Sequence, residues 1–112
     1  MKKAFLTSVL MAILPIWIMA HPAKSVSATY NATTGKLKIS AVHQVKDVTN
    51  HYIITMVISV DGKVVKTLTY TKQSSTESQD DEVAVPEIKK GSKVDVKTKC
   101  NKFGTKSVSI VI

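Results

Sequence analysis

Imidazole and thiolate side chains mark two stretches of this chain of 112 residues as chemically informative. The first stretch contains His43 and His51, and the second runs from Cys100, the only cysteine, to Gly104. Imidazole and thiolate are the side-chain donors that suit borderline-soft transition metals. The sequence therefore predicts a metal site, provided that the fold brings together two stretches about fifty residues apart.

The N-terminal segment has the pattern of a secretory signal peptide. A positively charged start precedes an almost wholly apolar run, Ala4–Met19, and Ala20 is a small residue at which cleavage can occur. A membrane anchor is the alternative interpretation. Pro15 interrupts the apolar run and no positive flank follows it directly, which favours a signal peptide. We therefore expect residues 1–20 to be removed, leaving a periplasmic or secreted domain, residues 21–112, that has no membrane association.

The charge of the chain is basic but evenly distributed. All 16 basic residues are lysines, against 8 acidic residues, which gives a formal net charge of +8. The lysines are spaced singly, without a long basic run or interleaved aromatic residues, so nucleic-acid binding is not predicted. A solvated surface is expected, and its positive field can draw a small anion toward a site. A lone cysteine makes no internal disulfide, so the strands and the core must provide the stability.

Polar and apolar residues alternate with a period of two through most of the chain after the apolar segment. This alternation is typical of half-buried strands. Asp61-Gly62 adds the turn chemistry of a tight hairpin. The polar and acidic stretch Gln73–Glu82 is expected to be a solvent-exposed loop. The expected strands are 26–30, 36–42, 52–60, 63–70, 82–85, 93–100 and 106–112. About seven antiparallel strands without a convincing helix predict an all-β, immunoglobulin-like β-sandwich of one domain.

The expected strand ends place the candidate ligands near one another. His43 follows one strand, His51 begins the next, and Cys100 ends the penultimate strand. Loops of a sandwich cluster at its two ends, so such residues can converge on one site. Cleavage after Ala20 would also make His21 the N-terminal residue, with an imidazole and a free α-amine, a chelate typical of copper. The predicted metal ligands are therefore His21, His43, His51 and Cys100.

These motifs resemble the superoxide reductase family, the iron domain of neelaredoxin and desulfoferrodoxin. That family has a His-Pro-x4-His-x-Ile stretch, a glycine-containing hairpin and a Cys-Asn-x-His-Gly turn. The positions that carry the resemblance are His43, His51-Tyr52-Ile53, Asp61-Gly62-Lys63, Cys100-Asn101 and Gly104. The resemblance thus extends from His43 to Gly104, with a fitting order of strands.

The resemblance implies a mononuclear, non-haem iron with four equatorial histidines, an axial thiolate and an open sixth position for superoxide. His43 and His51 would be equatorial ligands and Cys100 the axial one. The implied partners are a small anion such as superoxide and an electron-donor protein. The chain departs from the family in that Phe103 stands in place of the last histidine. Gln44 also replaces the proline, and the interval to His51 is longer by two residues.

Three functions are left open by these residues. The first is an exported mononuclear metal protein, an oxidoreductase similar to superoxide reductase if it is active. The second is a non-enzymatic accessory or binding domain that kept the fold without the chemistry. The third is a copper or zinc carrier that uses His21. Phe103 argues against superoxide reduction, whereas the combination of His43, His51 and Cys100 favours a metal site.

Overall fold

The computed structural model describes residues 21–112, and the expected signal peptide, residues 1–20, lies outside the described residues. The strands are β1 (Ser25–Asn31), β2 (Lys36–Val42), β3 (Ile53–Val60), β4 (Lys63–Thr69), β5 (Ser78–Ala84), β6 (Lys93–Cys100) and β7 (Thr105–Val111). Residues 21–112 contain no helix, so none of this part of the chain forms a helix that could cross a membrane. The all-β prediction is confirmed.

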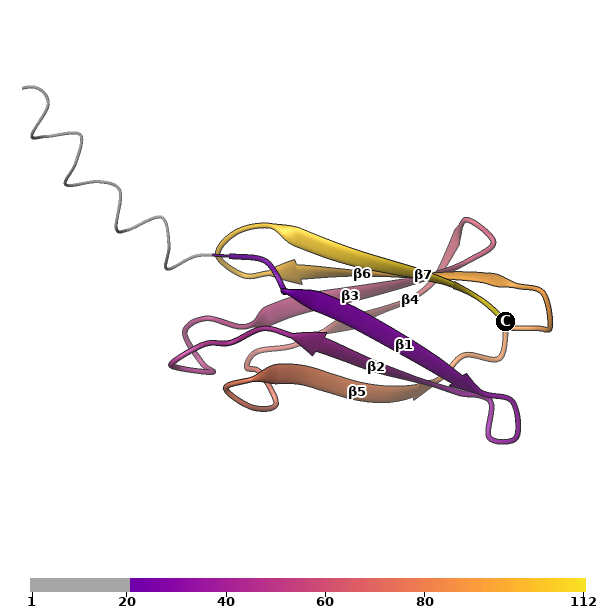
Figure 1. Cartoon of the computed structure of the whole chain (residues 1–112), viewed down its shortest axis with the longest axis horizontal. Coiled ribbons are helices and arrows are strands. Elements are labelled where there is room, and N and C mark those ends of the chain that lie inside the picture. Colours follow the sequence, from indigo (N-terminus) through magenta and orange to yellow (C-terminus); the bar gives the residue numbers. More distant parts are fainter. Residues whose placement is uncertain (1–20) are drawn as a thin grey trace, which may run out of the picture.

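The strands form two sheets that pack face to face (Figure 1). One sheet has the order β1-β2-β5 and the other the order β4-β3-β6-β7, and every pairing is antiparallel. The chain switches sheets between β2 and β3, between β4 and β5, and between β5 and β6. This arrangement is the immunoglobulin-like sandwich that the sequence predicts.

The core lies between the sheets and follows from the alternation in the sequence. Every second side chain of β2 and β6 is buried, and β3 follows the same alternation from Met56 onward, after a register shift near its start. Core side chains with no exposed area include Leu37, Ile39, Ile53, Met56, Ile58, Val94 and Val96. Full burial of a side chain of this kind contributes about 1.5–3 kcal/mol, so these residues provide most of the driving force for folding.

Strand β5 corrects the prediction for the acidic segment. A strand was expected only at 82–85, yet β5 spans Ser78–Ala84 and pairs along its whole length with β2. Asp80 and Glu82 are exposed, whereas Asp81 points inward and accepts a hydrogen bond of 2.6 Å from the Tyr70 hydroxyl. The acidic run forms a strand because alternate carboxylates reach solvent and the inward one has a partner.

The two ends of the sandwich carry different loops (Figure 1). At one end β1, β3, β5 and β7 begin and β2, β4 and β6 end, and we call it the histidine end. It carries residues 21–24 and the loops 43–52, 70–77 and 101–104. The opposite end carries the turns 32–35 and 61–62 and the connection 85–92.

Candidate metal site

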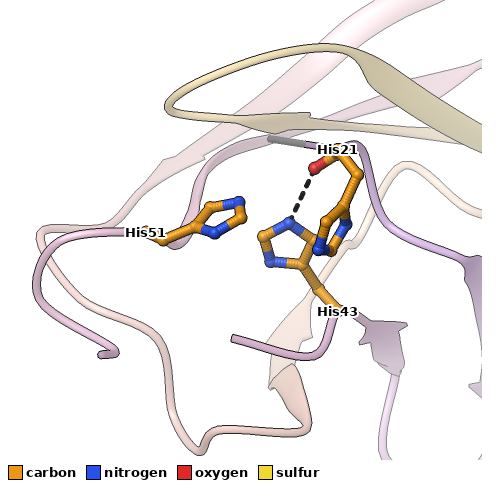
Figure 2. Close-up of side chains that lie close together, drawn as sticks. All are labelled: His21, His43 and His51. Carbon is orange, nitrogen blue, oxygen red and sulfur yellow. Dashed lines mark hydrogen bonds between the residues drawn. The ribbon is translucent and has the colours of Figure 1, made fainter. Parts of the chain in front are cut away.

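Three histidines from separate segments meet at the histidine end (Figure 2). His21 precedes β1, His43 directly follows β2, and His51 stands two residues before β3. One ring nitrogen of each can be chosen such that all three lie within 4.8 Å of one another. The ring centroids are 4.8 to 5.0 Å apart. The structure thus brings together three of the four ligands expected from the sequence.

The cluster is largely withdrawn from solvent. His43 has no exposed area, His51 is 9% exposed, and His21 is half-buried. Buried imidazoles are normally hydrogen-bonded, because an unpartnered polar group inside a protein costs free energy. The partners of each ring nitrogen therefore show what the cluster can bind.

His43 is held through both ring nitrogens. Its Nδ1 lies 2.7 Å from Oε1 of Gln73, and its Nε2 lies 3.0 Å from the backbone carbonyl oxygen of His21 (Figure 2). The second contact joins the end of β2 to the segment that precedes β1. His43 therefore has a fixed ring orientation, with Nε2 directed toward His21.

His51 has a buried nitrogen without a partner. Its Nε2 makes no hydrogen bond to any atom of the described residues. Burial lowers the pKa of His51 from its ordinary value, and the positive charges that His43, His21 and Lys102 can carry lower it further, while the backbone of His21 opposes part of this shift. A lowered pKa favours the neutral ring, in which one of the two nitrogens has a lone pair that a metal ion can use.

A contact between Pro22 and Gly104 positions His21. A Cβ atom on Gly104 would lie 2.9 Å from the Cβ of Pro22, closer than two such atoms can approach. Gly104 also has a φ of +88°, which favours glycine. On the other side, the backbone N–H of Lys24 donates to the carbonyl of Val42 at 2.7 Å. Gly104 therefore allows the N-terminal segment to pass close over the β6–β7 turn.

Asn101 ties the β6–β7 turn to the loop that carries His51. Its Oδ1 accepts from the backbone N–H of Tyr52 at 2.9 Å, and its own N–H donates to the Tyr52 carbonyl at 2.9 Å. Its side-chain amide donates to the carbonyl of Asn50 at 3.1 Å. The two side-chain hydrogen bonds beside His51 explain why an asparagine follows Cys100 in this turn.

Cys100 lies at the same end but outside the group of three histidines. It is 2% exposed and pairs across the sheet with Ile53, the second residue after His51. Its Sγ accepts a weak hydrogen bond from the backbone N–H of Lys102, with a distance of 3.4 Å between donor and acceptor. The buried ligand group of the described residues consists of His21, His43 and His51, without Cys100.

Phe103 is a surface residue. It is 64% exposed in the β6–β7 turn, next to Gly104. The position at which the superoxide reductase family has its last histidine therefore faces solvent in this chain. A ligand there would require the turn to adopt another conformation.

Gln73 is a part of the site that sequence reasoning missed. It lies in the β4–β5 loop, is 2% exposed, and contacts His43 through its side chain. Its neighbours are polar, so the sequence pattern indicated a solvent-exposed loop. No signal in the composition of the loop distinguished this glutamine from its exposed neighbours.

Comparison with family models, with curated protein sequences and with solved structures finds no match to this chain.

Proposed function

We propose that residues 21–112 form a domain that binds one divalent transition-metal ion through His21, His43 and His51. The observation that carries this proposal is the buried Nε2 of His51, which has no hydrogen-bond partner among the described residues and lies beside two further imidazoles. An unsatisfied buried polar group costs about 1–3 kcal/mol. A bond to a metal ion would remove that cost.

The donor set supports copper or zinc as the metal. Three imidazoles without a carboxylate suit copper(II) and zinc, and copper(II) binds most tightly among the divalent first-row metals. Three histidines plus an open position is also a known arrangement of catalytic zinc. Export with removal of residues 1–20 after Ala20 would add the α-amine of His21 as a fourth nitrogen donor. The domain would then act as a periplasmic or secreted copper or zinc carrier.

Metal binding must rearrange one contact of the metal-free site. The Nε2 of His43 now faces the carbonyl oxygen of His21 at 3.0 Å. A metal ion on this nitrogen would replace that contact, while the contact of Nδ1 with Gln73 is retained. The ion would therefore loosen the backbone of His21 from His43 and hold the same residue through its ring.

The test is a titration of the metal-free, full-length chain with Cu²⁺ and with Zn²⁺ in competition with a chelator of known affinity. We expect one ion per chain, and nitrogen hyperfine structure in the electron paramagnetic resonance spectrum of the copper form. A variant in which alanine replaces all three histidines should lose both, while circular dichroism reports its fold. A wild-type protein that binds no ion would overturn the proposal and favour a non-enzymatic accessory domain.

A second candidate is a superoxide-reductase-like iron site, and the position of Cys100 favours it. The thiol is buried at the histidine end. Cys100 pairs across the sheet with Ile53, which lies two residues after His51. A thiolate that joined the three imidazoles would increase the electron density on iron and favour reduction of superoxide, with electrons from a donor protein. Anaerobic loading with Fe²⁺ followed by oxidation should then give a thiolate-to-iron charge-transfer band. The absence of that band, or its survival in Cys100→Ala, would exclude this candidate.

A further inference from the structure

The geometry points to Gln73 as the positioning residue of the metal site, an inference that rests on the proposed function. Its role is to hold the proton of His43 on Nδ1 and thereby to present Nε2 to the ion. The buried amide group of Gln73 makes four hydrogen bonds.

The orientation of the Gln73 amide is fixed by partners other than the His43 ring. Its Nε2 donates to the backbone carbonyls of His43 at 2.7 Å and of Ser75 at 2.9 Å. Its Oε1 accepts from the backbone N–H of Ile53 at 3.2 Å. If the amide were flipped, its NH₂ group would face the backbone N–H of Ile53, and its oxygen would face the carbonyl oxygens of His43 and Ser75. Oε1 must therefore face Ile53, and it is the same atom that faces His43.

This orientation shows that Nδ1 of His43 carries a proton. Oε1 accepts hydrogen bonds only, and it lies 2.7 Å from Nδ1 of His43, so Nδ1 must be the donor of this contact. Nε2 faces the carbonyl oxygen of His21, and it is the nitrogen that an ion would take by replacing that contact. Histidine ligands of metal ions commonly donate their other ring N–H to an oxygen, which fixes the orientation of the ring.

Gln73 also connects the segments that carry two of the three ligands. Its side chain forms hydrogen bonds with the backbone of His43 and with that of Ile53, which lies two residues after His51. The backbone N–H of Gln73 donates to the carbonyl of Val48 at 3.0 Å. The loop between His43 and His51 is thereby held to the β4–β5 loop. Loss of Gln73 would change the ring of His43 and the separation of the two histidines together.

A second buried glutamine provides the matched control. Gln79 is 4% exposed, and its described hydrogen bonds go to the backbones of Ser74 and Asp80 rather than to a histidine. Gln73→Met and Gln79→Met each remove one buried amide and keep the size of the side chain. Both variants should lower the melting temperature of the metal-free protein, which measures the merely structural contribution.

The experiment uses the full-length chain and Cu²⁺ as the probe. We expect Gln73→Met to weaken copper binding by roughly 10–100-fold, as is usual for loss of a group that orients a ligand, and to change the copper hyperfine spectrum. Gln79→Met should keep the wild-type affinity and spectrum. Equal copper affinity in wild type and Gln73→Met, or an equal loss in both variants, would overturn the role of Gln73.

Nitrogen-15 NMR of the metal-free protein separates this role from the proposed function. The wild-type spectrum should show the proton of His43 on Nδ1, and in Gln73→Met that proton should no longer be confined to Nδ1. A wild-type ring without a proton on Nδ1 would overturn the assignment of Gln73. A wild-type protein that binds no metal would instead overturn the proposed function, and the role of Gln73 in ligand presentation with it.

Discussion

The two ends of the sandwich bury different kinds of side chain. At the opposite end the connection 85–92 covers the core with Val85 and Ile88, which are apolar and almost fully buried. At the histidine end the buried groups include His43, His51 and Gln73. The opposite end is thus closed mainly by apolar side chains, with Ser92 as a buried polar one, and the histidine end mainly by ionisable or hydrogen-bonding ones. Burial of polar groups is costly, and this cost agrees with the proposal that the histidine end binds the metal ion.

The two ends also differ in which groups join their segments. At the opposite end most long-range bonds are made by backbone groups, such as that from the N–H of Val85 to the carbonyl of Gly35, together with the Oδ1 of Asp61, which accepts from the N–H of Lys93. At the histidine end long-range side-chain bonds are more numerous, and they join His43 to Gln73 across 30 positions and Asn101 to Tyr52 across 49. Backbone bonds can be made by almost any residue, whereas side-chain bonds need specific residue types in several loops. The histidine end therefore depends more on the identity of its residues.

The largest effect is expected from His51→Leu. Loss of a group that only orients a ligand weakens binding by roughly 10–100-fold, so loss of the ligand itself should weaken copper binding by about 100-fold or more. The metal-free protein should at the same time become more stable, by about 1–2 kcal/mol, because the unpartnered Nε2 is removed. Copper titration and urea unfolding measure the two changes. A variant that kept its affinity would show that His51 is not a ligand.

A smaller effect on binding is expected from Gly104→Ala, with Gly91→Ala as its counterpart at the opposite end. The two glycines have nearly equal φ values, +88° and +89°, so alanine should cost about 1 kcal/mol of backbone strain at each. Only the Cβ at position 104 would collide with a neighbour, Pro22, and displace His21. We expect copper affinity to fall by about 10-fold in Gly104→Ala alone, on the scale of other losses of ligand positioning.

Equal copper affinity in the Gly104 and Gly91 variants would contradict the proposed contribution of His21. The melting temperatures of the two metal-free proteins provide the control, since the strain at both positions is similar. A larger fall in melting temperature for Gly104→Ala would measure the additional clash with Pro22.

The stability of the metal-free protein should depend on pH through His51. Its pKa is lowered in the folded state from an ordinary value of 6.5, so the unfolded chain takes up the proton first as the pH falls. The free energy of unfolding contributed by this group is therefore constant above that value and decreases as the pH drops toward the folded pKa. Urea unfolding between about pH 8 and about pH 5 measures the decrease. A decrease of the same size in His51→Leu would assign it to other groups.

The smallest effect is expected from Phe103→His. The side chain at this position is 64% exposed, so a new imidazole should remain outside the cluster. Copper affinity should change by less than about 3-fold, which is below 1 kcal/mol in free energy. A gain of an order of magnitude would show that the β6–β7 turn can supply a fourth histidine and would favour the iron candidate.

The fold was predictable from the sequence wherever polar and apolar residues alternate along a strand. The seven strands and the sandwich follow from the period of two and from turns such as Asp61-Gly62, where both residues adopt positive φ. The prediction for β5 was wrong at its start, because Asp81 turns inward to meet Tyr70, a partner distant in sequence. Composition cannot reveal such a partner.

The site was predictable only in its residue types. His21, His43 and His51 were expected as ligands because imidazole is rare in the chain and lies near the expected strand ends. Cys100 was expected in the same group, and it lies buried at the same end without joining it. Gln73 could not be found, because its role depends on four hydrogen bonds to three residues, of which His43 and Ile53 lie in other segments.

Strand β7 runs from the histidine end to the opposite end, where the N–H of Gly91 donates to the carbonyl of Ile112. The C-terminus and the three imidazoles therefore lie at opposite poles of the domain (Figure 1). A purification tag, a fluorescent label or an electrode linker attached after Ile112 would lie at the end of the domain away from the imidazoles. The same attachment directly before His21 would crowd them.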